Sequence, residues 1–191
     1  MTGTASLFAG RVALITGGTR GIGLATAEVF ARHGAQTVLT YKWGTADEDG
    51  VTARIVAAGG PAPLLLQADV SIEADTKALL QTVKERVGRI DAFISNASMA
   101  LIVKGMEDYT ERGFLKSLRS GAWPTFGYLT AMKEAFGVYP RHVVIMSSDG
   151  PDRFTPAYDF VAASKAVAET LTRYLAYRLR DEGVRINVLR S

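Results

Sequence analysis

The most informative stretch of this 191-residue chain is Thr16-Gly17-Gly18-Thr19-Arg20-Gly21-Ile22-Gly23. It follows the apolar run of residues 12–16, which is short enough to form a buried strand. After it, an amphipathic pattern predicts a helix that ends near Gly34, with one face formed by Ile22, Ala25, Thr26, Val29 and Phe30. Strand, glycine-rich turn and helix in this order indicate a phosphate-binding turn, because glycine lets the backbone approach a ligand and a helix N-terminus attracts anions. An ordinary tight turn is the simpler alternative.

The rest of the chain repeats this alternation of strand and helix. Short runs of β-branched and aliphatic residues occupy positions 12–16, 36–40, 63–67, 90–95, 142–147 and 185–189. Helical periods lie between them, as in 76–87 before Gly88 and 171–179 before Gly183. The helical pattern of residues 104–137 is interrupted by glycines and Pro124, which predicts a kinked or broken helix. Apolar strands joined by helices predict one α/β domain over residues 1–191, with a doubly wound parallel sheet of the Rossmann type.

The composition excludes several classes of protein. With 48% hydrophobic and 21% charged residues, the chain has the proportions of a globular domain. The absence of cysteine excludes a disulfide framework, a thiolate metal site and a cysteine nucleophile, and two histidines are too few for a histidine-rich metal site, so we expect no metal. The 22 basic residues are scattered among 19 acidic ones, so we expect no nucleic-acid surface. Residues 1–10 lack the pattern of a signal peptide and no apolar run approaches the ~20 residues that span a bilayer, which predicts a cytoplasmic protein.

The glycine turn resembles that of the short-chain dehydrogenase/reductase superfamily, whose T-G-x-x-x-G-I-G pattern is matched at every fixed position. Further landmarks follow in order within residues 11–187. Asp69-Val70 looks like the family's aspartate that binds the adenine amino group, Ser95-Asn96-Ala97-Ser98 resembles its Asn-Asn-Ala-Gly, and Ser147-Ser148 ends the fifth strand as in the family. The resemblance implies a nicotinamide dinucleotide site formed by Gly17, Thr19, Arg20, Gly21, Ile22, Gly23, Thr40, Lys42, Asp69, Val70, Asn96, Ala97 and Lys165.

The end of the second strand indicates which dinucleotide binds. NAD enzymes usually carry an acid there, which accepts hydrogen bonds from the adenosine ribose. Thr40-Tyr41-Lys42 offers no carboxylate, whereas Arg20 and Lys42 carry the charge that a 2′-phosphate needs. We therefore expect NADP(H), although Lys42 could equally be a solvated loop lysine.

The spacing of the expected catalytic residues departs from the commonest pattern of the superfamily. Most members use Tyr-x-x-x-Lys, but Val161 stands where that tyrosine would be. Tyr158 and Lys165 form Tyr-x6-Lys instead, a step of about 10.5 Å along a helix, which makes direct contact between them improbable. This spacing resembles the NADPH-dependent third type of enoyl-acyl carrier protein reductase, in which a Ser-Ser pair also lies eleven residues before the tyrosine, as Ser147 does here. The resemblance implies Tyr158, Lys165 and Ser148 as catalytic residues.

The implied reaction is hydride transfer from NADPH to the β-carbon of a 2-enoyl thioester in fatty-acid or polyketide biosynthesis. Tyr158 would donate to the thioester oxygen, Lys165 would hold the nicotinamide ribose hydroxyls, and Asn96 would line the cofactor path. The alternatives are a carbonyl or 3-ketoacyl reductase of the same superfamily, and a non-catalytic dinucleotide-binding protein. The simpler interpretation of Tyr158 is an ordinary packed aromatic residue before a helix, which would suit a non-catalytic protein.

Three departures from the family pattern accompany this resemblance. Ser120 stands where the family usually has an asparagine, Phe154 replaces a second tyrosine, and the chain stops at Ser191, before the family's usual last strand, which suggests a C-terminal truncation.

The expected partners also follow from the resemblance. They are a small-molecule or carrier-bound acyl thioester and a second copy of the chain in a homodimer or homotetramer. An acyl carrier protein is a further candidate, which could dock on Arg173, Arg178, Arg180, Arg185 and Arg190.

Overall fold

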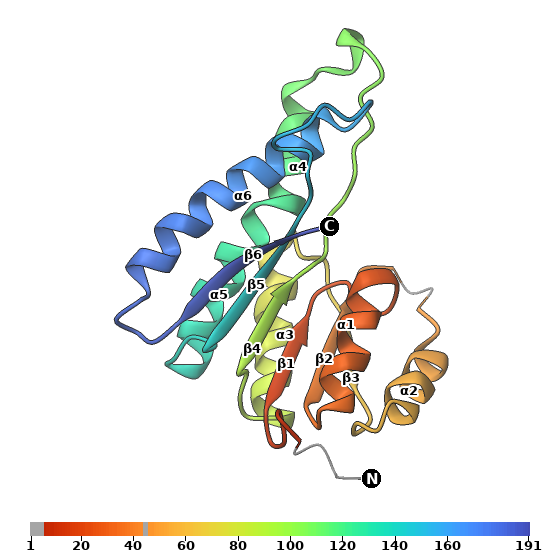
Figure 1. The fold of residues 1–191 in the computed structure, drawn as a ribbon, viewed down its shortest axis with the longest axis vertical. Coiled ribbons are helices and arrows are strands. Elements are labelled where there is room, and N and C mark those ends of the chain that lie inside the picture. The colour runs from red at the N-terminus through yellow and green to blue at the C-terminus, as the bar shows by residue number, and fades with distance from the viewer. Residues whose placement is uncertain (1–5, 44–45) are drawn as a thin grey trace.

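A computed structural model describes residues 6–43 and 46–191. Its parallel sheet has the strand order β3-β2-β1-β4-β5-β6 (Figure 1). The strands are β1 (Val12–Ile15), β2 (Gln36–Tyr41), β3 (Leu64–Gln67), β4 (Ala92–Ser95), β5 (His142–Ser147) and β6 (Arg185–Arg190). The helices are α1 (Gly21–Arg32), α2 (Glu48–Ala57), α3 (Glu73–Arg86), α4 (Glu111–Gly121), α5 (Trp123–Phe136) and α6 (Asp159–Arg178), with a short 3₁₀ turn at Met106–Asp108. The predicted doubly wound parallel sheet is confirmed.

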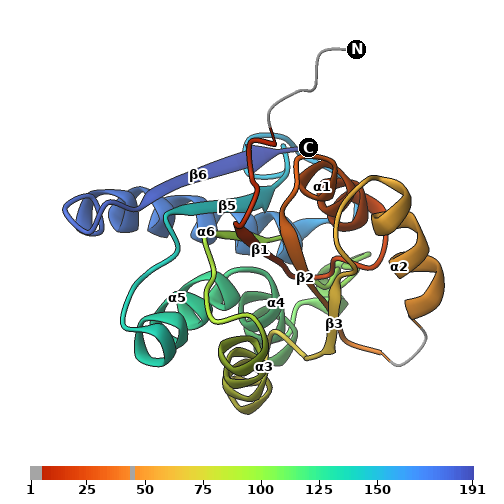
Figure 2. The ribbon, with the colours of Figure 1, turned by 90° about the horizontal axis from the view of Figure 1, so that it is seen from below.

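Helices cover both faces of the sheet, as Figure 2 shows. On one face, α1 and α2 bury side chains such as Leu24 and Ile55 against Ile15 and Leu39. The opposite face is covered by α3, α5 and α6, and its core includes Phe93, whose ring stacks on that of Tyr128 at 5.2 Å. Burial on both faces explains why the strands are nearly continuous apolar runs.

The buried face of α1 differs from the one that the sequence predicts. Ile22 and Val29 are about half exposed, whereas the buried residues of the helix are Gly23, Leu24, Ala27 and Ala31. Glycine and alanine let the helix backbone approach the sheet closely, and the larger β-branched side chains are therefore left on the outside. The amphipathic pattern correctly predicted the helix but gave the wrong face.

The expected break in residues 104–137 lies between α4 and α5, at Ala122. Pro124 stands in the first turn of α5, where its missing N–H leaves no helical hydrogen bond unmade. Within the described part of the chain, no helix combines the length and the apolar character needed to cross a membrane.

Successive strands are added on one side of β1 up to β3 and on its other side from β4 onwards, so the strand order has its switch point between β1 and β4. In an open parallel sheet, a crevice for ligands forms at this switch point, outside the carboxyl ends of the strands. The glycine turn after β1 and the Asn96 segment after β4 border that crevice, so the fold itself determines where a dinucleotide would lie.

Candidate active site

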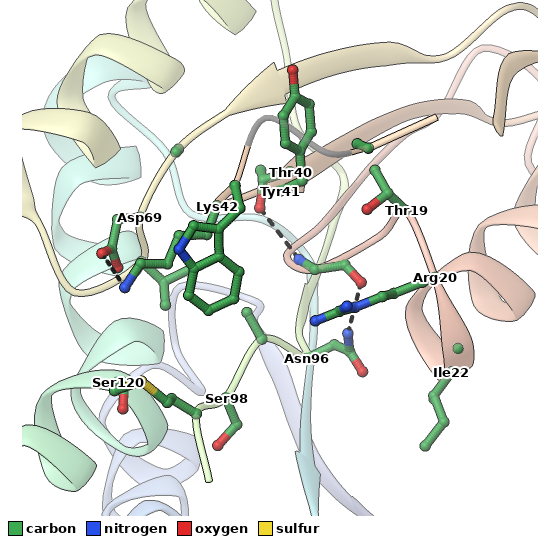
Figure 3. A pocket seen from close by; sticks show the side chains of 18 of the residues that line it. Thr19, Arg20, Ile22, Thr40, Tyr41, Lys42, Asp69, Asn96, Ser98 and Ser120 are labelled. Carbon is green, nitrogen blue, oxygen red and sulfur yellow. Dashed lines mark hydrogen bonds and ion pairs between the residues drawn. The ribbon is translucent and has the colours of Figure 1, made fainter. Parts of the chain in front are cut away.

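A cleft of about 460 Å³ lies at this switch point (Figure 3). The expected cofactor residues that line it are Gly17, Thr19, Arg20, Gly21, Ile22, Thr40, Lys42, Asp69, Val70, Asn96 and Ala97. Gly23 and Lys165 belong to the expected set but do not line the cleft. The cleft therefore gathers the landmarks that the sequence spreads over about eighty positions.

The glycine turn has the backbone shape of a phosphate cradle. Gly17 and Gly21 have φ of +63° and +53°, a region that favours glycine, and a Cβ on Gly21 would meet nothing within 4 Å. A Cβ on Gly23 would instead clash with the carbonyl oxygen of Gly17 and would lie 2.7 Å from the amide nitrogen of Asn96. Gly21 leaves the mouth of the turn open and Gly23 lets the helix start pack tightly beneath it, so the turn fits a dinucleotide pyrophosphate.

Asn96 and Thr40 hold this turn in place. The Asn96 amide donates to the carbonyl oxygens of Thr16 at 2.9 Å and of Gly17 at 3.2 Å. The Thr40 hydroxyl accepts from the N–H of Gly17 at 3.3 Å, and Thr40 is 1% exposed. The Thr40 hydroxyl therefore holds the backbone of the glycine turn, and Thr40 also forms part of the cleft wall.

An ion pair crosses the far end of the cleft, at the ends of β2 and β3. The Lys42 ammonium lies 2.6 Å from a carboxylate oxygen of Asp69. Burial by itself would raise the pKa of Asp69, but the hydrogen bonds from Lys42 and Ser71 outweigh it and lower the pKa. Lys42 also lies 5.1 Å from the centre of the Trp43 ring, which borders the same cleft. An ammonium has three N–H donors, so Lys42 keeps donors for an anion while paired with Asp69.

Tyr158 lies at the N-terminus of α6, at the end of the loop that follows β5. The residue before it, Ala157, has a φ of +62°, the left-handed region that a residue with a Cβ rarely adopts. The Tyr158 ring packs on Gly150, where a Cβ would lie 2.9 Å from two ring carbons. The Ser148 hydroxyl accepts from the N–H of Gly150 at 3.3 Å. Gly150 therefore contacts both expected catalytic residues, Tyr158 and Ser148, but neither of them lines the cleft.

Lys165 lies two turns into α6, on the face that packs on the sheet. It is 6% exposed, and its ammonium donates to the carbonyl oxygen of Met146 at 2.8 Å, at the carboxyl end of β5. Burial lowers the pKa of Lys165 to about 8. Within the described residues no hydrogen bond joins Lys165 to Tyr158, as the seven-residue step predicts. The seven-residue interval thus separates Tyr158, at the end of the loop, from the buried Lys165 on the helix.

The two residues that depart from the family pattern have different surroundings. Ser120 is buried and borders the cleft, but its hydroxyl donates to the carbonyl oxygen of Lys116 at 2.9 Å, within its own helix. Phe154 is 87% exposed. In the described part of the chain, Ser120 makes no hydrogen bond with Tyr158 or Lys165, and the Phe154 side chain has no polar atom that could make one.

Sequence reasoning missed a polar network behind Lys165. Glu169, one turn further along α6, accepts from the Ser147 hydroxyl at 2.6 Å and pairs with Arg190, which also contacts Asp152. The spacing of four residues from Lys165 places Glu169 on the same helix face and was a usable signal. Nothing in the sequence connects Arg190 with Asp152, which lies 38 positions away.

Comparison with known proteins agrees with this geometry. Residues 17–191 match the family model described as enoyl-(acyl carrier protein) reductase. The 1-cyclohexenylcarbonyl-CoA reductase of Streptomyces collinus is 31% identical over 185 residues, which are 94% of this chain and 63% of that protein. The NADH-dependent enoyl-[acyl-carrier-protein] reductase of Aquifex aeolicus is 28% identical, over 96% of this chain and 68% of its own.

Solved structures resemble the fold closely. The NADH-dependent reductase A1-R′ of alginate metabolism has a TM-score of 0.85 and 25% identity, over 97% of this chain and 78% of its own. A metagenomic short-chain oxidoreductase in complex with NADP also scores 0.85 at 25% identity, over 96% and 81% of the two chains. The cleft and its glycine turn therefore belong to a nicotinamide dinucleotide site. The chain is a member of the enoyl-(acyl carrier protein) reductase family within the short-chain dehydrogenase/reductase superfamily.

Proposed function

We propose that the protein is an NADPH-dependent reductase of 2-enoyl thioesters. The observation that carries this proposal is the separation of Tyr158 from Lys165, with Tyr158 at the end of a strained loop and Lys165 buried behind β5. Reduction of a carbonyl needs a proton donor beside the oxygen bonded to the carbon that accepts hydride. Reduction of an enoyl thioester needs the donor beside the thioester oxygen, which lies two atoms further from the carbon that accepts hydride. A tyrosine displaced along the chain suits the second geometry.

The bound dinucleotide would supply the hydride, and the residues of this chain would do the rest. The Tyr158 hydroxyl would donate a hydrogen bond to the thioester oxygen, where negative charge collects when hydride reaches the β-carbon, and a proton from solvent would then reach the α-carbon to complete the saturated thioester. Lys165, protonated below a pKa of about 8, would supply a positive field and donors for ribose hydroxyls. Ser148, fixed beside Gly150, would position the substrate carbonyl.

NADPH is proposed over NADH because of the charges around the cleft. The carboxylate at the end of β3, Asp69, is already paired with Lys42 at 2.6 Å. Arg20 is exposed at the mouth of the glycine turn, and it makes no ion pair with any residue of the described ranges 6–43 and 46–191. Two cations near the adenosine end favour a 2′-phosphate.

The substrate is proposed as a thioester on coenzyme A or on an acyl carrier protein, since the matched relatives include one enzyme of each name. A second candidate function is reduction of a ketone. It is favoured by a 31% identical relative, the hydroxynaphthalene reductase of Aspergillus fumigatus. The first assay therefore follows NADPH oxidation with a short 2-enoyl thioester and, in parallel, with a 3-ketoacyl thioester.

Tyr158→Phe separates the proposed enzyme from a non-catalytic binding protein. Removal of the hydroxyl should lower kcat about a hundredfold or more, while the NADPH dissociation constant stays the same. NADPH oxidation with the 3-ketoacyl thioester alone would favour the ketone reductase. Silence of the wild type with both substrates would reject the proposal.

We also propose that the protein is a homo-oligomer through the outer face of α6. Val167, Leu171, Tyr174 and Tyr177 recur at helical spacing along this face, and each is at least 37% exposed. Apolar side chains gathered on one helix face are typical of an interface. Light scattering of the wild type and of Leu171→Asp tests this, with a dimer or tetramer expected for the first and dissociation for the second; a monomeric wild type would reject it.

A further inference from the structure

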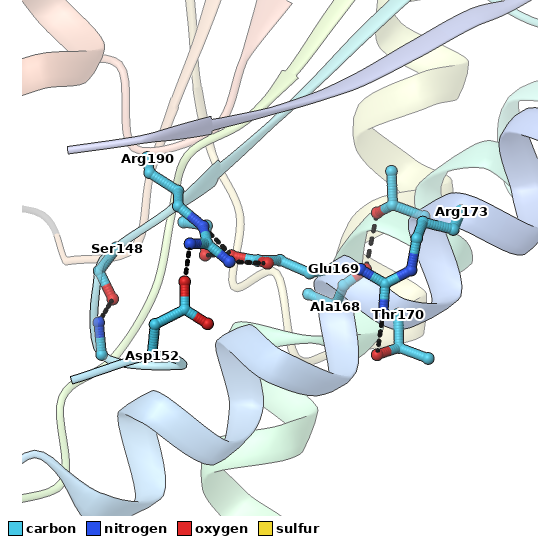
Figure 4. A network of polar contacts seen from close by, with 10 residues as sticks. Ser148, Asp152, Ala168, Glu169, Thr170, Arg173 and Arg190 are labelled. Carbon is cyan, nitrogen blue, oxygen red and sulfur yellow. Dashed lines mark hydrogen bonds and ion pairs between the residues drawn. The ribbon is translucent and has the colours of Figure 1, made fainter. Parts of the chain in front are cut away.

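The guanidinium of Arg190 joins two carboxylates at the end of β6 (Figure 4). Its Nε and Nη2 donate to the two oxygens of Glu169 at 2.9 and 2.6 Å, a bidentate arrangement. Its Nη1 contacts the carboxylate of Asp152. Arg190, one of the five arginines named as candidates for docking an acidic carrier protein, is thus paired with two carboxylates of its own chain.

The Glu169 side of this contact is buried. Its side chain is 9% exposed, the Arg190 fork lowers its pKa, and it also accepts from the Ser147 hydroxyl. Together with the Lys165 ammonium on the Met146 carbonyl, it fixes one face of α6 to the last two residues of β5. A carboxylate at this depth needs a partner, which Arg190 provides.

The Asp152 side of the contact lies on the surface. Its side chain is 61% exposed, and an ion pair at such a site contributes little to stability. Asp152 belongs to the loop that starts at Ser148 and ends at Tyr158. Ala157, in the left-handed region, joins this loop to Tyr158, and the Tyr158 ring packs on Gly150, two residues before Asp152. A shift of the loop would therefore move the surface on which the ring lies.

We propose that Arg190 is a positioning residue for Tyr158. It fastens the loop that carries the tyrosine, through Asp152, to the helix that carries Lys165, through Glu169. The proposal rests on the proposed catalytic role of Tyr158 for its effect on turnover, but the tie between loop and helix stands on the contacts alone.

Asp152→Asn is the main test, because it removes the charge at an exposed site and leaves Glu169 paired. Asp149→Asn is its matched control, since Asp149 lies in the same loop, is also 61% exposed, and approaches its partner Arg153 only to 4.0 Å. In Asp152→Asn we expect kcat with the enoyl thioester to fall about two- to fivefold, because the loss of an exposed ion pair can shift the loop population by no more than this, with the NADPH dissociation constant and Tm unchanged. Asp149→Asn should change none of these.

A second measurement reads the tyrosine without turnover. The protein is labelled with 3-fluorotyrosine, and the ¹⁹F resonance of Tyr158 is assigned by its loss in Tyr158→Phe. We expect this resonance to shift or broaden in Asp152→Asn and to stay in place in Asp149→Asn. Arg190→Lys, which keeps the charge but loses the fork, should shift it in the same direction as Asp152→Asn.

The two measurements separate the inference from the proposed function. If the wild type does not reduce enoyl thioesters, the proposed function fails, and the ¹⁹F comparison alone decides whether the loop is tied. An unchanged Tyr158 resonance in Asp152→Asn overturns the tie. A shifted resonance with unchanged kcat in an active enzyme overturns the positioning role, as does an equal loss of kcat in Asp149→Asn.

Discussion

Replacement of Lys165 by methionine should change the pH dependence of folding stability. Methionine keeps a similar length and apolar stem but cannot be protonated. In the native protein burial lowers the pKa of Lys165 to about 8, whereas the ordinary value of 10.5 applies to the unfolded chain. Between these two values the unfolded chain binds more protons than the native protein, so Lys165 makes the wild type more stable as the pH rises.

The size of the effect follows from the same two values. A pKa difference of this size means that the protonated Lys165 lowers the unfolding free energy by about 3 kcal/mol below pH 8, because each pKa unit is worth about 1.4 kcal/mol. Between about pH 7 and pH 10, most of this penalty disappears. The unfolding free energy of the wild type should therefore gain about 2–3 kcal/mol relative to Lys165→Met over this range.

Urea unfolding of both proteins at several values of pH measures this difference directly. Since other groups titrate in both proteins, their contributions cancel in the comparison. The proposed contact with ribose hydroxyls adds a second expectation: NADPH affinity of the wild type should weaken above pH 8, where the ammonium loses its proton. A stability difference that is constant with pH would refute the assignment of a buried, readily deprotonated lysine.

Three further substitutions test other parts of the site. Gly23→Ala places a Cβ against Gly17 and 2.7 Å from the Asn96 amide, so we expect a loss of about 1–3 kcal/mol in stability and at least tenfold weaker NADPH binding in a fluorescence titration; unchanged binding would contradict the tight packing. Gly150→Ala displaces the Tyr158 ring and should lower kcat about tenfold without weakening NADPH binding, whereas a loss of binding alone would place the ring elsewhere. Lys42→Ala should weaken NADPH binding about tenfold and leave NADH binding almost unchanged, and equal losses for both would remove Lys42 from 2′-phosphate recognition.

Most of the fold was predictable because it depends on local patterns. Each predicted strand matches an observed one within two residues at either end, since apolar β-branched runs have few other stable environments. Pro124 correctly predicted the interruption between α4 and α5. The face of α1 was not predictable from hydrophobicity, because close packing favoured the small side chains of Ala27 and Ala31 over that of Val29.

The site was predictable where a motif has a fixed backbone geometry, as in the glycine turn. The surroundings of single side chains were less accessible. The pairing of Lys42 with Asp69 and the tie between Arg190 and Asp152 join residues from different loops, and only the assembled sheet brings these loops together. The left-handed backbone of Ala157 has no sequence signal at all, because alanine seldom adopts it.

The most direct test of the proposed reaction follows the hydride itself. NADPH that carries deuterium at the transferred position is incubated with the protein and a short 2-enoyl thioester, and the product is analysed by mass spectrometry and NMR. An enoyl reductase should yield a saturated thioester with one deuterium on the β-carbon, and Tyr158→Phe should form it far more slowly. An unchanged enoyl thioester, together with deuterium on the carbinol carbon of a product formed from a 3-ketoacyl thioester, would contradict the account.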